Sequence, residues 1–471
     1  MDRRDGAPVT AAPAGAAFAD DALTDDTLTD GAPIDDGGKA VPTSRTGRLL
    51  RVGGLAADVA SDMLVNGARA AVTGGRPDMR DLLLTPRNAR KVADELAKLR
   101  GAAMKVGQLL SMDGGDFLPP ELAEVLARLR ASATPMPPQQ LKSTLNRAWG
   151  AGWLKKFSRF DAAPMAAASI GQVHRATTRD GRDLAIKVQY PGVRDSISSD
   201  VDNMGALIGL SRLAPKSLDV DRLLDEAKRQ LHEEADYERE GACMERFAGL
   251  LDGDPDYLTP RLQADLTTPS VLAMTRLGGA PVEDFADADQ AVRDRIVMLA
   301  IRLLYRELFE FRLMQTDPNF ANFRYDAETG RLILLDFGAT HELSPALSEG
   351  YRRLVAAGYR GDEDAMFDAV RDIGLMDPAV LAAQRAEFAD MLRMATEPLR
   401  LDGPFDFAAS DLAGRLRDKG LDLPQEDVIG HTPPTDALYL HRKFGGIYLL
   451  AVRLKARVDV RALFKPYADG A

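Results

Sequence analysis

The sequence predicts an α+β fold in which a small β-rich part is followed by a larger helical part. Residues 164–189 alternate with the period of two that is typical of β-strands. A long charged helix is predicted over residues 219–250. After Gly278-Gly279 helical spacing dominates. Shorter strands are predicted near 257–263, 270–276 and 331–335.

The composition is that of a soluble globular protein with more than one core. The chain has 471 residues, of which 45% are hydrophobic and 28% charged. Its net charge is −11, and residues 1–43 contribute much of it, with nine Asp against three basic residues. Nucleic-acid binding needs a basic stripe, which the chain lacks. We therefore predict no nucleic-acid partner.

The first 43 residues are predicted to be a disordered acidic tail. They are rich in Asp and broken by Pro8, Pro13 and Pro33, which is unlike a secretory signal. No apolar stretch approaches the roughly 18–20 residues that span a bilayer. The single cysteine, Cys243, lies in a helical pattern and is interpreted as a small core residue. These features favour a reducing, cytoplasmic compartment.

Residues 44–150 are predicted to form an all-helical extension. In residues 44–72, three arginines lead into apolar residues at helical spacing. This pattern fits a helix on a membrane surface, or a helix that packs on the main body, which we slightly prefer. Helices are also predicted over 88–112 and 120–131. Residues 151–280 would then form the β-rich part and 281–471 the helical part.

A β-hairpin is predicted around Asp180-Gly181, flanked by residues 170–178 and 183–189. Alternate residues of a strand face opposite sides, so Ala185 and Lys187 share one face. The other face takes Leu184, Ile186 and Val188. A small residue beside a lysine suits contact with adenine and pairing with phosphates. A lysine on a half-exposed strand is otherwise usually only solvated.

Two segments further along the chain carry acids at suggestive spacing. Asp317 precedes Asn322 by five residues, and Asp336 ends the apolar strand before Phe337-Gly338. Each segment alone is also compatible with an ordinary turn. Together with Lys187, in this order and on these elements, they predict a protein-kinase-like domain that binds Mg²⁺ and ATP. Asp317 would orient an acceptor hydroxyl, and Asn322 and Asp336 would hold the metal.

Such a domain also needs a glutamate on the long helix to pair with Lys187. The acids available there are Glu233, Glu234, Asp236, Glu238 and Glu240. On one continuous helix Glu234 and Glu240 would point about 120° apart, so that only one of them reaches Lys187.

Met274 is predicted to lie where the two lobes join. It ends a strand that runs into Gly278-Gly279. It is a candidate for contact with adenine, with core packing as the alternative.

The glycine-rich loop expected before the lysine strand is missing. In its place stand Ala166, Ala167, Ala168 and Ser169. Alanine carries a Cβ and adopts positive φ only at a cost. This segment is therefore expected to lie differently over the phosphates than a glycine-rich loop does.

These motifs resemble the UbiB family of atypical kinases, required for coenzyme Q (ubiquinone) biosynthesis, and are closest to its mitochondrial and alphaproteobacterial members. The resemblance runs from about Arg45 to about Phe464. It rests on the alanine-rich segment, Lys187 and residues 105–108, 234–237, 314–319, 335–340 and 438–443.

The resemblance implies that Lys187 pairs with Glu240 and binds the phosphates of ATP or ADP. It implies that Lys105 and Gln108 lie on a helix that covers the site where a kinase admits a protein substrate, held partly by Glu234 and Asp236. The alanine-rich segment is linked in the family to altered nucleotide preference and suppressed self-phosphorylation.

The chain departs from many kinases and family members by having Gln315 two residues before Asp317, where they have histidine. Metal binding should survive this change.

Three functions stay open. The first is an ATP-dependent enzyme that supports ubiquinone biosynthesis, either as an ATPase or as a kinase whose acceptor is unknown or small and lipid-like, such as a quinone precursor. The second is a pseudokinase scaffold that organises coenzyme Q proteins and uses nucleotide as a switch. The third is an ordinary kinase, which the alanine-rich segment argues against. A peripheral contact with the inner membrane of a bacterium is also expected.

Overall fold

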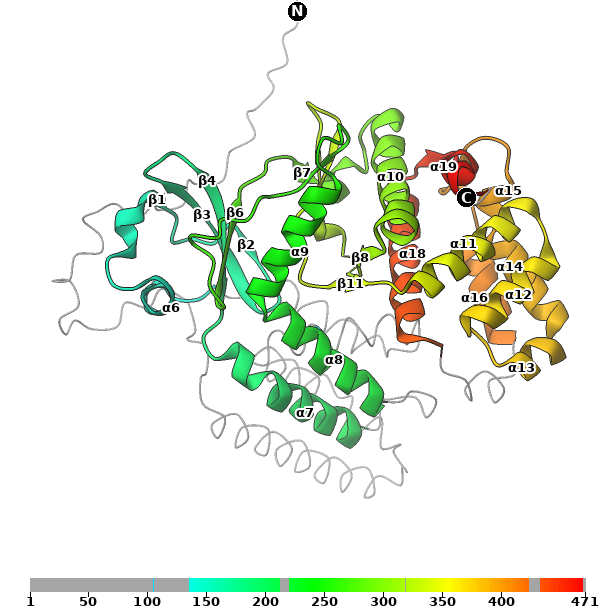
Figure 1. The fold of residues 1–471 in the computed structure, drawn as a ribbon, viewed down its shortest axis with the longest axis horizontal. Coiled ribbons are helices and arrows are strands. Elements are labelled where there is room, and N and C mark those ends of the chain that lie inside the picture. Colours follow the sequence, from blue (N-terminus) through cyan, green and yellow to red (C-terminus); the bar gives the residue numbers. More distant parts are fainter. Residues whose placement is uncertain (1–104, 106–134, 212–219, 318, 423–432, 469–471) are drawn as a thin grey trace, which may run out of the picture. The chain divides into compact units, whose positions relative to one another are not determined.

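The computed structural model describes residues 105, 135–211, 220–317, 319–422 and 433–468. Gln108, the segment 44–72 and the acidic tail lie outside these residues, as do most of the helices expected before residue 135. The described chain combines sheets and helices, which confirms the predicted α+β class (Figure 1). The four-part division made from the sequence stays a prediction.

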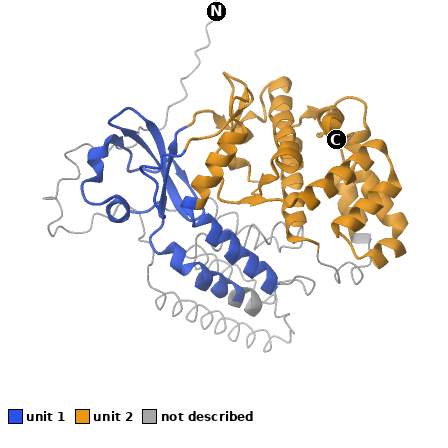
Figure 2. Cartoon of the chain, in the orientation of Figure 1, with its two compact units in different colours: residues 1–238, 262–276 blue, residues 239–261, 277–471 orange. Residues whose placement is uncertain are grey.

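The chain divides into two compact units (Figure 2). Unit 1 takes the described residues up to Glu238 and Leu262–Arg276, and unit 2 takes Arg239–Arg261 and the described residues from Leu277 onward.

Unit 1 is built on an antiparallel sheet of five strands in the order β1-β3-β4-β6, with β2 paired to β3. The strands are β1 (Phe157–Phe160), β2 (Ala166–Ala167), β3 (Gly171–Thr178), β4 (Asp183–Gln189) and β6 (Val271–Thr275). The hairpin β3–β4 lies where Asp180-Gly181 predicted it, and Gly181 takes φ 91°, which a glycine adopts without strain.

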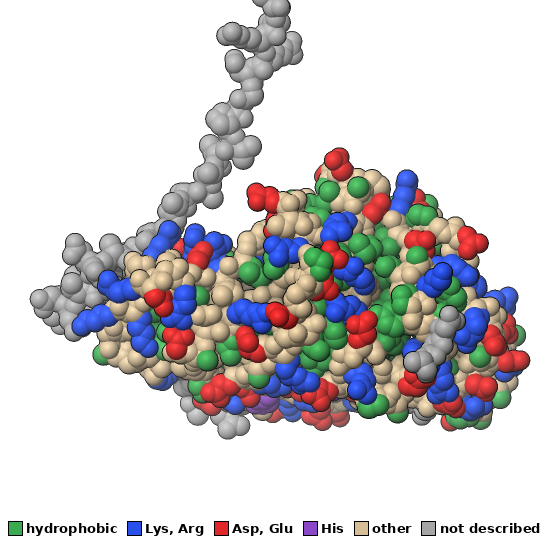
Figure 3. Space-filling view, turned by 45° about the horizontal axis from the view of Figure 1, so that its top comes forward, with side chains coloured by type: hydrophobic (Ala, Val, Ile, Leu, Met, Phe, Trp, Pro, Cys, Tyr) green, Lys and Arg blue, Asp and Glu red, His purple; other side chains and the backbone are tan. Residues whose placement is uncertain are grey.

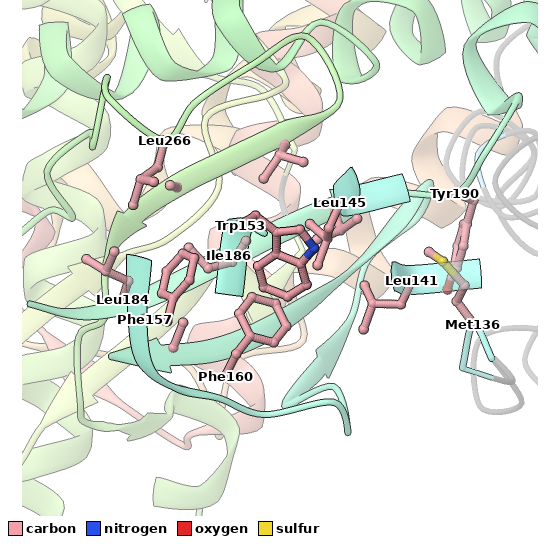
Figure 4. Packing of buried hydrophobic residues seen from close by; sticks show 14 residues of the cluster. Met136, Leu141, Leu145, Trp153, Phe157, Phe160, Leu184, Ile186, Tyr190 and Leu266 are labelled. Carbon is pink, nitrogen blue, oxygen red and sulfur yellow. The ribbon is translucent and has the colours of Figure 1, made fainter. Parts of the chain in front are cut away.

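One face of this sheet packs into an apolar core. Figure 4 shows side chains of β4 gathered with aromatic rings from β1 and from the turn before it. The rings of Trp153 and Phe160 lie 4.9 Å apart, edge to face. Leu184, Ile186 and Val188 are completely buried in this cluster, each worth about 1.5–3 kcal/mol. The predicted facing is therefore confirmed, and Ala185 and Lys187 lie on the opposite face.

The helices of unit 1 are α6 (Pro138–Trp149), α7 (Val193–Ser211), α8 (Val220–Glu234) and the first two residues of α9 (Tyr237–Leu250). The prediction of one helix over 219–250 was wrong, because the chain breaks between α8 and α9. Gln189 on β4 donates its side-chain amide to the carbonyl oxygen of Ala235 at 2.7 Å. That carbonyl is thereby satisfied from outside the helix, and the 120° geometry expected for Glu234 and Glu240 does not apply.

Unit 2 contains a four-stranded sheet in the order β5-β10-β9-β7 and two further strand pairs, β8 with β11 and β12 with β13. The strands are β5 (Tyr257–Leu258), β7 (Ala280–Pro281), β8 (Leu313–Gln315), β9 (Phe323–Asp326), β10 (Arg331–Leu334), β11 (Thr340–Glu342), β12 (Phe405–Asp406) and β13 (Arg457–Val458). The strand expected near 257–263 is thus shorter than predicted.

Helices form the rest of unit 2, and α10 packs against α18 and α19 (Figure 1). Besides α9 from Arg239 onward, the α-helices are α10 (Gln290–Tyr305), α11 (Pro345–Arg360), α12 (Glu363–Ile373), α13 (Pro378–Ala383), α14 (Arg385–Ala395), α15 (Glu397–Arg400), α16 (Leu412–Asp422), α18 (Thr435–Arg453) and α19 (Val460–Ala468). Among the described residues, no helix combines the length and apolarity needed to cross a bilayer.

The surface of the described residues mixes both signs of charge. On the face in Figure 3, acidic and basic side chains are interspersed. Many of them pair locally, as Arg352 does with Glu349 at 2.6 Å. The one cysteine, Cys243, is buried, and burial raises the pKa of its thiol, which fits the predicted core role.

Candidate nucleotide site

On strand β4, Ala185 and Lys187 lie on the same face, as the alternation of the sequence predicted. Lys187 is buried, and its Nζ lies 5.2 Å from the ring centroid of Tyr237. A cation over an aromatic ring is attracted by the negative ring face. Ala185 pairs directly with Met274 across β4 and β6. Unit 1 therefore brings Lys187 and the two predicted neighbours of adenine onto one face of the sheet.

The first two residues of the alanine-rich segment form the edge strand β2. Ala166 pairs with Val173 and Ala167 with Gln172, and both alanines are exposed. The backbone amide of Ala168 donates to the carbonyl of Gly171 at 3.0 Å. None of Ala166, Ala167, Ala168 and Ser169 has a positive φ, as expected of residues that carry a Cβ. How this segment lies over phosphates stays a prediction.

Glu234 joins Lys105 of the predicted extension to Ser169 of the alanine-rich segment. Its Oε1 lies 2.5 Å from Nζ of Lys105, and its Oε2 accepts from Oγ of Ser169 at 2.6 Å. Lys105 is 2% exposed and Glu234 14% exposed, so the ion pair is largely removed from water. The structure thus brings Lys105, Ser169 and Glu234 together. The predicted role of Asp236, which lies in the break between α8 and α9, stays a prediction.

The loop after β8 explains the spacing of Asp317 and Asn322. Asn322 donates from Nδ2 to Oδ2 of Asp317 at 3.2 Å. Between them a 3₁₀ turn, Phe320–Asn322, is capped by Asn319, whose side-chain oxygen accepts from the amide of Ala321. Because Nδ2 of Asn322 is engaged with Asp317, its side-chain oxygen is the atom that would serve a metal.

The end of β10 places Asp336 beside this loop. The amide of Leu335 donates to the carbonyl of Asn322 at 3.0 Å. Asp336 then accepts the amide of Gly338 on Oδ1 at 2.9 Å, which fixes the turn. A Cβ added to Gly338 would lie 3.3 Å from that Oδ1 and 3.6 Å from Oε2 of Glu240. Unit 2 therefore gathers Glu240, Asp317, Asn322 and Asp336 in one region.

The predicted pairing of Lys187 with Glu240 joins residues of different units and stays a prediction. Within unit 2, Glu240 is buried next to the turn that holds Asp336. Its neighbour Arg239 donates from Nη1 to the carbonyl of Gly338 at 2.8 Å. Arg239 of α9 thus contacts this turn, and Glu240 lies beside it.

The donor set of unit 2 suits Mg²⁺. The ion prefers oxygen ligands and usually keeps waters and substrate phosphates in its shell. Asp336 supplies a carboxylate and Asn322 an amide oxygen. No group of three or more Asp, Glu, His or Cys side chains in the described ranges is arranged to hold a metal ion. A magnesium ion at this site would therefore need further oxygen ligands besides Asn322 and Asp336. The phosphates of a bound nucleotide would supply them.

Sequence reasoning missed the residues that fix this region from behind. Gln315 was recognised only as a departure from histidine, yet its Nε2 donates to the carbonyl of Asp336. Lys443 and Glu307 pair at 2.8 Å and contact the backbone of Gln315. Lys443 was noticed only as part of a motif, and a lone Glu307 in a helical pattern gave no signal.

The lysine strand, the Asp-x₄-Asn loop and the strand ending in Asp-Phe-Gly, on this α+β fold, define a protein-kinase-like domain. Residues 128–370 match the model of the ABC1 atypical kinase-like domain. The chain belongs to this family of atypical kinases, which confirms the resemblance seen in its motifs.

Similar proteins cover most of the chain. The mitochondrial atypical kinase COQ8 of Saccharomyces cerevisiae is 37% identical over 90% of this chain and 85% of its own length. The mitochondrial atypical kinase COQ8B of Rattus norvegicus is 37% identical over 91% of this chain and 81% of its own.

A solved structure shares the fold. The complex of Rv3197 with erythromycin from Mycobacterium tuberculosis is similar at a TM-score of 0.57 and 26% identity. The match covers 80% of this chain and 94% of the mycobacterial one.

Proposed function

We propose that this protein binds Mg²⁺ and ATP and acts as an atypical kinase or ATPase that supports ubiquinone (coenzyme Q) biosynthesis. The observation that carries this proposal is the gathering of Asp317, Asn322, Asp336 and Glu240 in unit 2. The relatives named COQ8 and COQ8B support the pathway.

Each residue has a defined task in this proposal. Lys187 binds the α- and β-phosphates and pairs with Glu240, while Ala185 and Met274 contact adenine. Asn322 and Asp336 hold Mg²⁺, which when bound neutralises charge on the phosphates. Asp317 orients the acceptor hydroxyl or water and accepts its proton. In the structure its carboxylate accepts from Asn322 and from the amide of Asn319, which restricts its orientation.

The acceptor is proposed to be small or lipid-like. Glu234 ties Lys105 of the helical extension to Ser169 of the alanine-rich segment. A protein substrate would have to displace a buried ion pair to approach from that side. A quinone precursor or water would not, and ADP is a possible nucleotide besides ATP. Gln108 is proposed to lie on this extension, and Asp236 to help Glu234 hold it. Coenzyme Q proteins are proposed as partners of the protein.

A scaffold function is the second candidate, and the contact between Ser169 and Glu234 favours it. Ser169 is the last residue of the segment proposed to cover the nucleotide, and the carboxylate of Glu234 that accepts from it also pairs with Lys105. Nucleotide binding at Ala166–Ser169 would therefore reach the extension through two hydrogen bonds. In this version the protein organises coenzyme Q enzymes without transferring phosphate.

One experiment separates the two candidates. A bacterial strain deleted for its own copy is complemented with wild type or with Asp317→Asn, and its quinones are quantified. The enzyme proposal expects that Asp317→Asn fails to restore ubiquinone although the protein accumulates normally. Full restoration by Asp317→Asn would favour the scaffold, and no restoration by wild type would remove the pathway altogether.

The protein is proposed to act in the cytoplasm and at the surface of the bacterial inner membrane, because quinone precursors are lipid-soluble. Flotation with liposomes, compared between the full chain and a variant lacking residues 44–72, tests whether that segment makes the contact. Equal flotation of both would place the contact elsewhere.

A further inference from the structure

A buried ion pair lies behind the catalytic loop in unit 2. Nζ of Lys443 on α18 lies 2.8 Å from Oε2 of Glu307, and the two side chains are 1% and 0% exposed. Removing two charges from water costs more than their attraction returns unless further hydrogen bonds complete the site. Stability alone therefore does not explain why this ion pair is buried here.

The further hydrogen bonds all go to one residue. Nζ of Lys443 donates to the carbonyl oxygen of Gln315 at 2.8 Å. The amide of Gln315 donates to Oε1 of Glu307 at 3.3 Å. The ion pair thus holds both the donor and the acceptor of the Gln315 backbone, two residues before Asp317.

Gln315 also contacts the backbone of the proposed metal ligand Asp336. Its side chain is buried, and Nε2 donates to the carbonyl oxygen of Asp336. The next residue, Thr316, donates from its amide to the carbonyl of Ala339 at 2.9 Å. The segments that carry Asp317 and Asp336 are therefore fastened to each other at Gln315.

The backbone that presents Glu307 is irregular. After α10 the chain continues as a π-helical turn, Arg306–Phe311, and then Arg312 takes φ 50°, in the left-handed region. Both features cost free energy and concentrate at functional sites. The π-helical turn and Arg312 together make up the seven residues before β8. This irregular backbone places Glu307 next to Gln315 of β8.

We propose that Lys443 and Glu307 are positioning residues. Their hydrogen bonds to the backbone of Gln315 fix the positions of Asp317 and Asp336. This inference rests on the proposed ATP-dependent function. It makes the late helix α18 (Thr435–Arg453) a part of the catalytic apparatus, although neither residue belongs to the proposed nucleotide site. The alternative is that the pair only stabilises the fold.

A double variant separates positioning from stability. Lys443→Met combined with Glu307→Leu replaces the pair by apolar side chains of similar size, which removes the buried charges but leaves the amide and the carbonyl of Gln315 without these two partners. The midpoint of urea unfolding is expected to fall, so kcat and ATP binding are compared where the variant is fully folded. Positioning predicts that the folded variant keeps an ATP dissociation constant within about two-fold of wild type while its kcat falls about 100-fold, the effect expected of a loop misplaced by about 1 Å. A kcat within about three-fold of wild type would overturn the inference.

The matched control is Tyr351→Phe. Tyr351 on α11 shares a hydrogen bond of 2.7 Å with Nε2 of His441, two residues before Lys443, and this bond does not involve Gln315. It should lower the urea midpoint slightly and leave kcat unchanged. An equal loss of kcat in this control would mean that any loosening of α18 slows the enzyme, which contradicts a specific grip on Gln315.

Glu307→Gln serves if the double variant does not fold. It keeps the shape and an acceptor oxygen but loses the charge that holds Lys443, so kcat should fall at least about ten-fold with the ATP dissociation constant unchanged. An unchanged kcat would overturn the inference. A wild type that binds Mg-ATP without turning it over would instead overturn the proposed enzymatic function, and this inference with it.

Discussion

Nζ of Lys105 lies 2.5 Å from Oε1 of Glu234, across 129 positions of the chain. The lysine is 2% exposed and the carboxylate also accepts from Ser169. A single carboxylate at the end of α8 therefore fastens a residue of the extension to the body of unit 1. Removing the carboxylate of Glu234 should therefore lower the stability of the fold.

Glu234→Ala is expected to lower the free energy of unfolding by about 3 kcal/mol, because it removes the carboxylate from a buried ammonium group. Urea unfolding followed by circular dichroism measures this. Glu233→Ala is the matched control on the same helix. Glu233 pairs with Arg229 at 2.5 Å in a partly exposed position, so its loss should cost only about 0–1 kcal/mol. Equal losses in the two variants would contradict the importance of the buried pair.

Asp336 and Asp317 are expected to fail in different ways. Asp336→Ala removes a proposed metal ligand, so Mg²⁺-dependent ATP affinity should fall at least about ten-fold. Asp317→Asn keeps the size of the side chain and should leave the ATP dissociation constant unchanged, while kcat falls about 10²–10⁴-fold. Calorimetric titration with Mg-ATP and a phosphate-release assay give the two numbers. If both variants lost affinity equally, Asp317 would be a metal ligand.

His174 on β3 is held in its neutral form. Nδ1 lies 2.8 Å from the carbonyl of Asp161, which can only accept, so Nδ1 carries the proton. Nε2 then accepts from Nε2 of Gln172 at 2.8 Å, and Oε1 of Gln172 accepts from the amide of Met136. Burial lowers the pKa of His174 to about 4 from its usual 6.5.

Stability should fall as the pH drops below 6.5. Above 6.5 the histidine is neutral in both states and contributes no pH dependence. Between pH 6.5 and about 4, His174 binds a proton in the unfolded chain but stays neutral in the folded chain. This difference lowers the free energy of unfolding by about 2 kcal/mol at pH 5. Comparing urea unfolding at pH 7 and pH 5 for wild type and His174→Gln isolates this share. An identical pH dependence in both proteins would refute it.

Gly171 has no room for a side chain. A Cβ there would overlap the carbonyl oxygen of Val188 and lie 2.9 Å from Oη of Tyr237. Gly171→Ala should therefore lower the free energy of unfolding by about 1–3 kcal/mol. Gly249→Ala is the control, since Gly249 lies in α9 with no atom within 4 Å of an added Cβ. That change should stabilise by about 0.5–1 kcal/mol. Thermal unfolding of the two variants gives the comparison.

Local patterns predicted the parts of the fold that depend on neighbouring residues. The β3–β4 hairpin follows from Asp180-Gly181 and from alternation, and the facing of Lys187 follows from the same period. The loop from Asp317 to Asn322 closes on itself through one hydrogen bond, so its spacing is visible in the sequence.

Contacts between distant residues account for what the patterns missed. The break after α8 depends on Gln189, 46 residues from Ala235. The strand expected near 257–263 stops at Leu258, because Leu262 forms a bridge with Met274 instead. The grip on Gln315 needs Lys443, whose partners no helical or strand period identifies.

The position of Lys443 late in the chain has a consequence for biosynthesis. Gln315 and Lys443 are 128 positions apart. At a ribosomal speed of 5–20 residues per second, about 6–26 s pass between their synthesis. During that time Glu307 and the catalytic loop lack their cation, and the nascent chain has to wait for α18 before the loop is held in place.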